Sequence, residues 1–180
     1  MSEKPLNKFL QQLTNCIDID NLIIKGHILT EHALNFYIEI NSFEKPDKNS
    51  KFTYATKIEI AQLLGLFKTN KELKKDLKLL NKLRNSIAHN LNYNEEIFDE
   101  LLSNIHRLGN DSLKDMKNDA QVFIKNNEPQ IFEKINDKFV PLFNGTTKIS
   151  GRHIKFMGLI ARTCGFIFSL AEDHSKQKKV

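Results

Sequence analysis

The 180-residue chain is poor in the residues that build tight turns and covalent cross-links, with seven glycines, four prolines and two cysteines. Cys16 and Cys164 stand far apart and outside any CxxC spacing. This pattern argues against a disulfide framework or a paired-thiol metal site, and we expect both to be small buried apolar residues. Few turn residues and no alternating strand pattern point to an all-α protein.

Segments that would direct the chain to a membrane are also lacking. The N-terminal MSEKPLNKF has no apolar signal core. The most apolar run, Phe156 to Leu170, carries Arg162 and is too short to span a bilayer comfortably. We therefore expect a cytoplasmic protein with no membrane partner. No glycine-rich phosphate loop, nucleophile elbow or zinc spacing is present, so we expect neither cofactor nor metal.

What the chain does have is basic charge, with 27 Lys+Arg against 22 Asp+Glu and a net charge of +5. A nucleic-acid partner is compatible with this charge, although a lysine-rich surface also serves solubility. Only four of the 27 are arginine: Arg84, Arg107, Arg152 and Arg162. An arginine fork binds phosphate or carboxylate through two parallel hydrogen bonds, which lysine cannot do. The arginines are therefore candidates for anion binding.

Apolar periodicity predicts six helices, over residues 3–13, 18–40, 54–67, 70–90, 95–102 and 150–173. The helix from 18 is apolar on most sides and should be central, with Asp18 or Asp20 as its cap. Thr69 or Asn70 should start the helix that ends near His89 or Asn90. In the last helix, Gly158, Ala161 and Gly165 should permit a close crossing.

The predicted architecture is a single domain, 1–180. Its core comprises about residues 18–104 and the last helix, about 150–174. Residues 105–148 form an insertion, for which we expect short docked helices that carry Phe123, Phe132, Phe139 and Phe143. The fold class is an all-α bundle of about five core helices with an additional helical insertion.

Arg84 interrupts an otherwise apolar stripe. Leu73, Leu77, Leu80, Ile87 and Leu91 recur at helical spacing, and Arg84 occupies the stripe one turn beyond Leu80. A charged group at an apolar position violates the binary pattern, and such violations tend to mark functional or strained sites. We therefore take Arg84 and the nearby His89 as candidate site residues.

The element Arg84-Asn85-(x)2-Ala88-His89, at the end of an amphipathic helix, resembles the Arg-x(4–6)-His signature of the HEPN superfamily. These are four- to five-helix bundles found in many prokaryotic RNA-cleaving toxins and antiphage effectors. The resemblance extends over the order of helices from about residue 18 to 104. The layout is also similar to the mannitol operon repressor group, whose members act as regulators.

The HEPN resemblance implies a metal-independent endoribonuclease in which a ribose 2′-hydroxyl attacks the adjacent phosphate. His89 would be the general acid or base and Arg84 would stabilise the transition-state charge. Asn85, one turn before His89, would orient the imidazole. The resemblance also implies a homodimer whose two motifs face one cleft, RNA as substrate, and a role as toxin or antiphage effector, with an antitoxin as a candidate protein partner.

Three further residues are expected to support this site. Glu31 would orient Arg84 or His89, His27 lies one turn before Glu31, and Tyr93 would stack on a base or contact phosphate. One HEPN subgroup has a tyrosine, modified by a partner nucleotidyltransferase, two residues after the histidine. Leu91 stands there in this chain, which argues against that pairing.

Two other readings remain open. Arg84 and His89 could be structural, with Arg84 paired to Glu31 in the core and His89 favoured by the dipole at a helix C-terminus. Alternatively, the protein is a non-enzymatic regulator or interaction module, like the mannitol operon repressor group. A helix-turn-helix DNA binder is disfavoured, because no compact recognition-helix unit is found.

Overall fold

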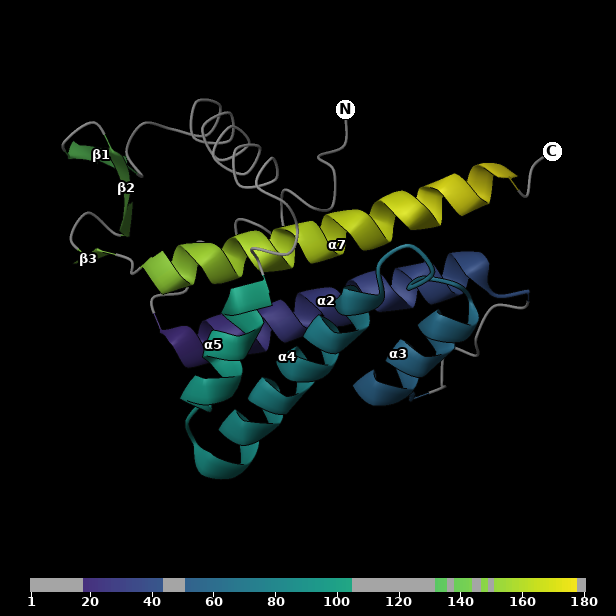
Figure 1. The fold of residues 1–180 in the computed structure, drawn as a ribbon, viewed down its shortest axis with the longest axis horizontal. Coiled ribbons are helices and arrows are strands. Elements are labelled where there is room, and N and C mark those ends of the chain that lie inside the picture. Colours follow the sequence, from purple (N-terminus) through teal and green to yellow (C-terminus); the bar gives the residue numbers. More distant parts are fainter. Residues whose placement is uncertain are drawn as a thin grey trace.

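The computed structural model describes residues 18–43, 51–104, 132–135, 138–143, 147–148 and 151–177. Its bundle is all-α, as predicted (Figure 1). The helices are α2 (Ile19–Asn41), α3 (Tyr54–Leu63), α4 (Lys71–Asn90), α5 (Glu95–Ser103) and α7 (Gly151–Gln177). The expected helix 3–13 and Cys16 lie outside the described residues. Among the described helices, none is both long and apolar enough to cross a bilayer.

Helix α2 is the centre of the bundle, as predicted, and packs against α3, α4 and α7. Asp18 is its cap, with a side chain that accepts a hydrogen bond from the Asn21 N–H at 3.0 Å. Helix α7 lies alongside α2 and completes the bundle (Figure 1). Cys164 of α7 is buried as expected, and burial raises the pKa of its thiol to about 12.

Helix α3 ends at Leu63, short of the predicted Phe67. The cause is Gly65, whose φ of +94° is a left-handed conformation that glycine adopts without strain. The Tyr37 hydroxyl donates to the Leu64 carbonyl at 3.1 Å, which holds this turn against α2. Leu66, expected inside, is fully buried although it lies beyond the helix.

The described parts of the insertion are strands, and the short helices expected for them are not found there. Strands β1 (Phe132–Ile135), β2 (Lys138–Phe143) and β3 (Thr147–Lys148) form an antiparallel sheet in the order β1-β2-β3. β1 pairs with β2 so that Phe132 lies opposite Pro141. The Asn136–Asp137 pair between the two strands is of the residue types that favour turns, a signal the periodicity analysis passed over.

The close approach of α2 and α7 depends on Gly26. A Cβ atom added there would lie 2.9 Å from Cε1 of Phe156 and 3.0 Å from Cγ1 of Ile160. The expectation that Gly165 permits the crossing is wrong, because a Cβ at Gly165 would meet nothing within 4 Å. A small residue that the contact requires is therefore Gly26, on the central helix, while the roles expected for Gly158 and Ala161 stay predictions.

Gly26→Ala should lower the free energy of unfolding by about 1–3 kcal/mol, because the buried Phe156 ring and Ile160 must shift to admit a methyl group. Gly165→Ala, the matched control, should raise it by up to about 1 kcal/mol through helix propensity. Urea unfolding followed by circular dichroism measures both. Equal effects of the two variants would contradict the close crossing at Gly26.

Candidate functional site

Helix α4 carries the whole Arg84–His89 motif. It runs from Lys71 to Asn90, and its N-cap is Asn70, whose side chain accepts from the Leu73 N–H at 3.2 Å. Leu91 then adopts a left-handed conformation (φ 62°), and its N–H donates to the Ile87 carbonyl at 3.0 Å. This conformation costs about 1–2 kcal/mol for a residue with a side chain. The helix is thus stopped two residues after His89 by a locally strained cap.

The Arg84 side chain is exposed, so the expectation that it lies in the buried stripe is wrong. Leu73, Leu77 and Leu80 are buried as predicted, but burial then continues through Leu83, and Leu91 at the end of the predicted stripe is 84% exposed. Helix α4 packs against both α2 and α5, which lie near it in Figure 1. The buried side of the helix includes Leu83 and leaves Arg84 exposed.

The motif side chains are only partly brought together. Arg84 Nη1 donates to Asn85 Oδ1 at 3.2 Å, and Asn85 and His89 are both exposed. The orienting role of Asn85 had predicted a hydrogen bond to His89. Within the part of the chain that the structure describes, no such bond is found. Arg84 and His89 are five residues apart, about 140° around a regular helix. One chain therefore presents them to solvent on different faces of α4.

Glu31 does not contact the motif. Its carboxylate forms an ion pair with Lys57 of α3 at 2.7 Å. Neither the predicted orienting role toward Arg84 or His89 nor the structural alternative of a buried Arg84–Glu31 pair is seen. Glu31 instead helps to fix α3 on α2, next to His27.

His27 is a buried polar residue near enough to the motif to be influenced by the charge of Arg84. Its Nε2 lies 3.2 Å from Oδ1 of Asn81 on α4, and its ring lies 4.0 Å from that of Tyr54. Burial lowers the pKa of His27, opposed by the Asn81 hydrogen bond, and the positive charge of Arg84 lowers it further. His27 is therefore neutral at pH 7. The sequence analysis missed Asn81, although it stands one turn before Arg84 and Asn85 on the same helix.

Tyr93 is engaged within the fold. Its hydroxyl donates to Glu95 at 2.6 Å, and its ring packs edge-on against Phe98 with centroids 5.2 Å apart. Burial raises the pKa of its hydroxyl to about 12, with the Glu95 hydrogen bond acting in the same direction. Its backbone N–H donates to Asp20 Oδ1 at 3.2 Å. Tyr93 thus holds the α4–α5 connection against the start of α2. This structural role differs from the contact with RNA that was expected for it.

An open groove of about 490 Å³ lies beside the motif, between α3 and α4. Its lining combines cationic, carboxylate, amide, hydroxyl and apolar groups: Ala55, Thr56, Ile58, Glu59, Lys78, Asn81 and Lys82. Asn81 connects the groove to His27, since its side chain contacts that imidazole. A volume of this size accommodates a ligand of several hundred Å³.

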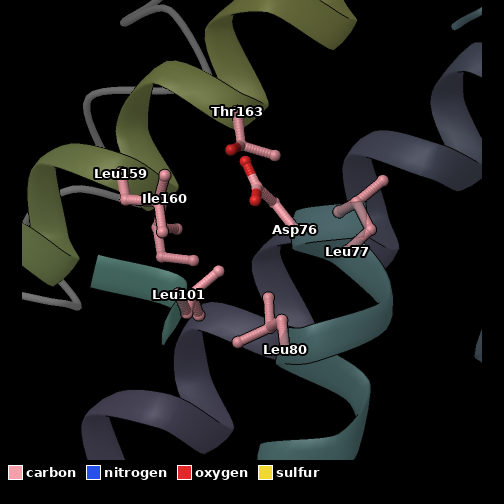
Figure 2. A pocket seen from close by; sticks show the side chains of 7 residues that line it. All are labelled: Asp76, Leu77, Leu80, Leu101, Leu159, Ile160 and Thr163. Carbon is pink, nitrogen blue, oxygen red and sulfur yellow. The ribbon is translucent and has the colours of Figure 1, made fainter. Parts of the chain in front are cut away.

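A second polar group, Asp76, is buried where α4 meets α5 and α7. It accepts a hydrogen bond from Asn104 Nδ2 at 2.7 Å. Asp76 and Thr163 point toward one another at the edge of an otherwise leucine- and isoleucine-lined cavity (Figure 2). That cavity is only about 10 Å³, room for roughly one water molecule. It is too small for a substrate, and Asp76 is best understood as part of the core.

His27 should make the stability of the fold depend on pH. Because its pKa in the folded protein is below the ordinary 6.5, the unfolded chain binds the proton more tightly. The stabilisation is complete above about pH 6.5 and declines as pH falls toward the folded pKa, by at most about 1.4 kcal/mol per pH unit. His27→Gln should flatten the loss between about pH 7 and 5, whereas His89→Gln, at an exposed position, should keep it. Thermal melts across this range test the difference, and a wild-type slope retained in His27→Gln would contradict it.

Comparisons with known proteins add no relative to this picture: no family model, no curated protein and no solved structure matches the chain. Among the described residues, no group of three or more histidine, cysteine or acidic side chains is arranged to hold a metal ion. The support for a function therefore comes from the motif, its helical setting and the geometry around it.

Proposed function

We propose that the protein is a HEPN-type, metal-independent endoribonuclease that acts as a homodimer. The observation that carries the proposal is the exposed Arg84–His89 motif in the last turns of α4. Within the described ranges, Arg84 forms no ion pair and His89 has no hydrogen-bond partner, so both remain available to a substrate. The helices α2 to α5 occur in the order that the HEPN resemblance requires.

In the proposed reaction the ribose 2′-oxygen bonds to the adjacent phosphorus and the P–O5′ bond breaks. One proton leaves the 2′-hydroxyl and another reaches the departing 5′-oxygen. His89 serves as the base or the acid, because an imidazole exchanges protons near neutral pH. Arg84 stabilises the negative charge that builds on the phosphate oxygens. The products are a 2′,3′-cyclic phosphate and a 5′-hydroxyl.

A second copy of the chain would complete the site. The two motif residues face different directions on one helix, whereas a two-fold pair can place both motifs in one cleft. Apolar surface for such a contact adjoins the motif, since Leu91, directly after it, is 84% exposed. Leu91 is a large aliphatic side chain that gains from being covered.

The cellular role that fits this activity is a cytoplasmic toxin or antiphage effector, held in check by a protein partner such as an antitoxin. The alternative is a non-enzymatic regulator resembling the mannitol operon repressor group. One observation favours it: a single chain leaves Arg84 and His89 without contact to each other. Cleavage of RNA by the purified protein distinguishes the two functions.

Wild-type protein should cleave pooled cellular RNA in EDTA and leave 5′-hydroxyl ends, which accept phosphate from a kinase without prior phosphatase treatment. His89→Ala should reduce the rate by about 10²–10⁴, the usual contribution of a general acid or base. Asn90→Ala, exposed on the same helical turn, is the control and should keep the activity. Absence of cleavage by folded wild-type dimer would favour the regulator, and full activity of His89→Ala would remove His89 from the site.

Light scattering at high micromolar concentration should give twice the 20.9 kDa mass of the chain. Leu91→Asp should shift the protein toward monomer and reduce cleavage in parallel, because a carboxylate would be buried at the contact. Leu63→Asp is the matched control, since Leu63 is 87% exposed at the end of α3. A wild type that stays monomeric would count against a site shared between two copies.

A further inference from the structure

One face of α4 carries a continuous row of cationic and polar side chains. Its members repeat at alternating steps of four and three residues, which places them on one side of a helix. We name this row the α4 stripe: Lys71, Lys75, Lys78, Lys82, Asn85 and His89. All six are exposed. At 1.5 Å per residue the stripe extends about 27 Å and ends at the proposed catalytic histidine.

The stripe is flanked by acidic residues on neighbouring helices. Glu100 of α5 lies 2.8 Å from Lys75, and Glu59 of α3 lies 3.1 Å from Lys78. Exposed ion pairs of this kind contribute only about 0–1 kcal/mol, so an RNA phosphate can displace either carboxylate. The outer two lysines, Lys71 and Lys82, form no ion pair within the described parts of the chain. They supply the uncompensated charge.

The stripe also borders the open groove. Lys78 and Lys82 both line it, together with Asn81 and Thr56, which add an amide and a hydroxyl. A strand that follows the stripe would therefore have its phosphates on the lysines and room for its sugars and bases over the groove. The groove ends one turn before Arg84 and Asn85 in the α4 sequence.

We propose that the α4 stripe is the track on which a single-stranded RNA backbone binds and is led to His89. Lysine ammonium groups act as point charges that contact phosphates whatever the base sequence, so the track gives affinity without sequence preference. A straight row along one helix suits an extended single strand, whereas duplex RNA is recognised across its wide minor groove. The end point at His89 rests on the proposed ribonuclease function, but binding along the lysines does not.

The test measures binding to a fluorescent, mixed-sequence 2′-O-methyl RNA of about 20 nucleotides, which lacks the attacking hydroxyl and stays intact. Full-length wild type is compared with Lys71→Gln/Lys82→Gln over a range of salt concentrations. Losing two phosphate contacts should weaken binding about tenfold or more and make the slope of log affinity against log salt shallower by about 1.4. Lys68→Gln/Lys155→Gln removes the same charge from exposed lysines outside α4 and should keep the wild-type slope.

An unchanged slope in the stripe variant, or an equal change in the control, would overturn the track. So would wild-type protein that fails to bind the RNA, that prefers the matching duplex, or that binds anionic phospholipid vesicles in its place. Cleavage of ordinary RNA is measured in parallel. If binding depends on the stripe but no RNA is cleaved, the track is upheld and the ribonuclease function is refuted. If RNA is cleaved but binding does not depend on the stripe, the ribonuclease function is upheld and the track is refuted.

Discussion

The burial of one side of α2 is the constraint on which the remaining structure depends. Helices α3, α4 and α7 together cover that side, while Ile28 and Phe36 on the other side stay exposed. Helix α7 takes the largest contact, made close by Gly26, while α4 contacts both α2 and α5. Lys75 and Asp76 join α4 to α5, and Asn81 joins it to α2. The motif residues follow these contacts in the last turns of α4, where Arg84 and His89 are exposed.

Electrostatics near the motif follows from the same arrangement. His27 is buried because it lies on the side of α2 that meets α4, and its contact with Asn81 fixes the point where the two helices cross. Beyond this point the surface is polar and positively charged, with Arg84 close enough to influence His27. The neutral imidazole of His27 lies in the core, and the guanidinium of Arg84, which forms no ion pair among the described residues, lies at the surface. Together they mark the boundary between the apolar core and a surface suited to binding an anion.

Local signals in the sequence were enough to predict the five helices of the described bundle, their order and several of their caps. Asp18 and Asn70 each cap a helix with a side chain that the residue type alone suggests. The exposure of Arg84 could not be predicted, because the spacing Leu80–Arg84 is ideal for burial and only the placement of the neighbouring helices decides against it. The His27–Asn81 contact joins residues 54 apart, and no local pattern indicates it. The lysines of the α4 stripe recur at helical spacing in the sequence, but a lysine-rich face opposite an apolar one is typical of any solvated helix, and nothing local distinguishes it.

The reactivity of Cys164 reports local opening of the bundle. Its thiol is buried in α7, and with a pKa near 12 almost none of it is thiolate at neutral pH. An alkylating reagent can reach it only when α7 lifts away from its neighbours. The rate of labelling at this position is therefore set by how often the longest helix contact in the bundle opens, much as amide exchange reports local unfolding. A ligand or second subunit that clamps the bundle would slow this chemistry without touching the cysteine.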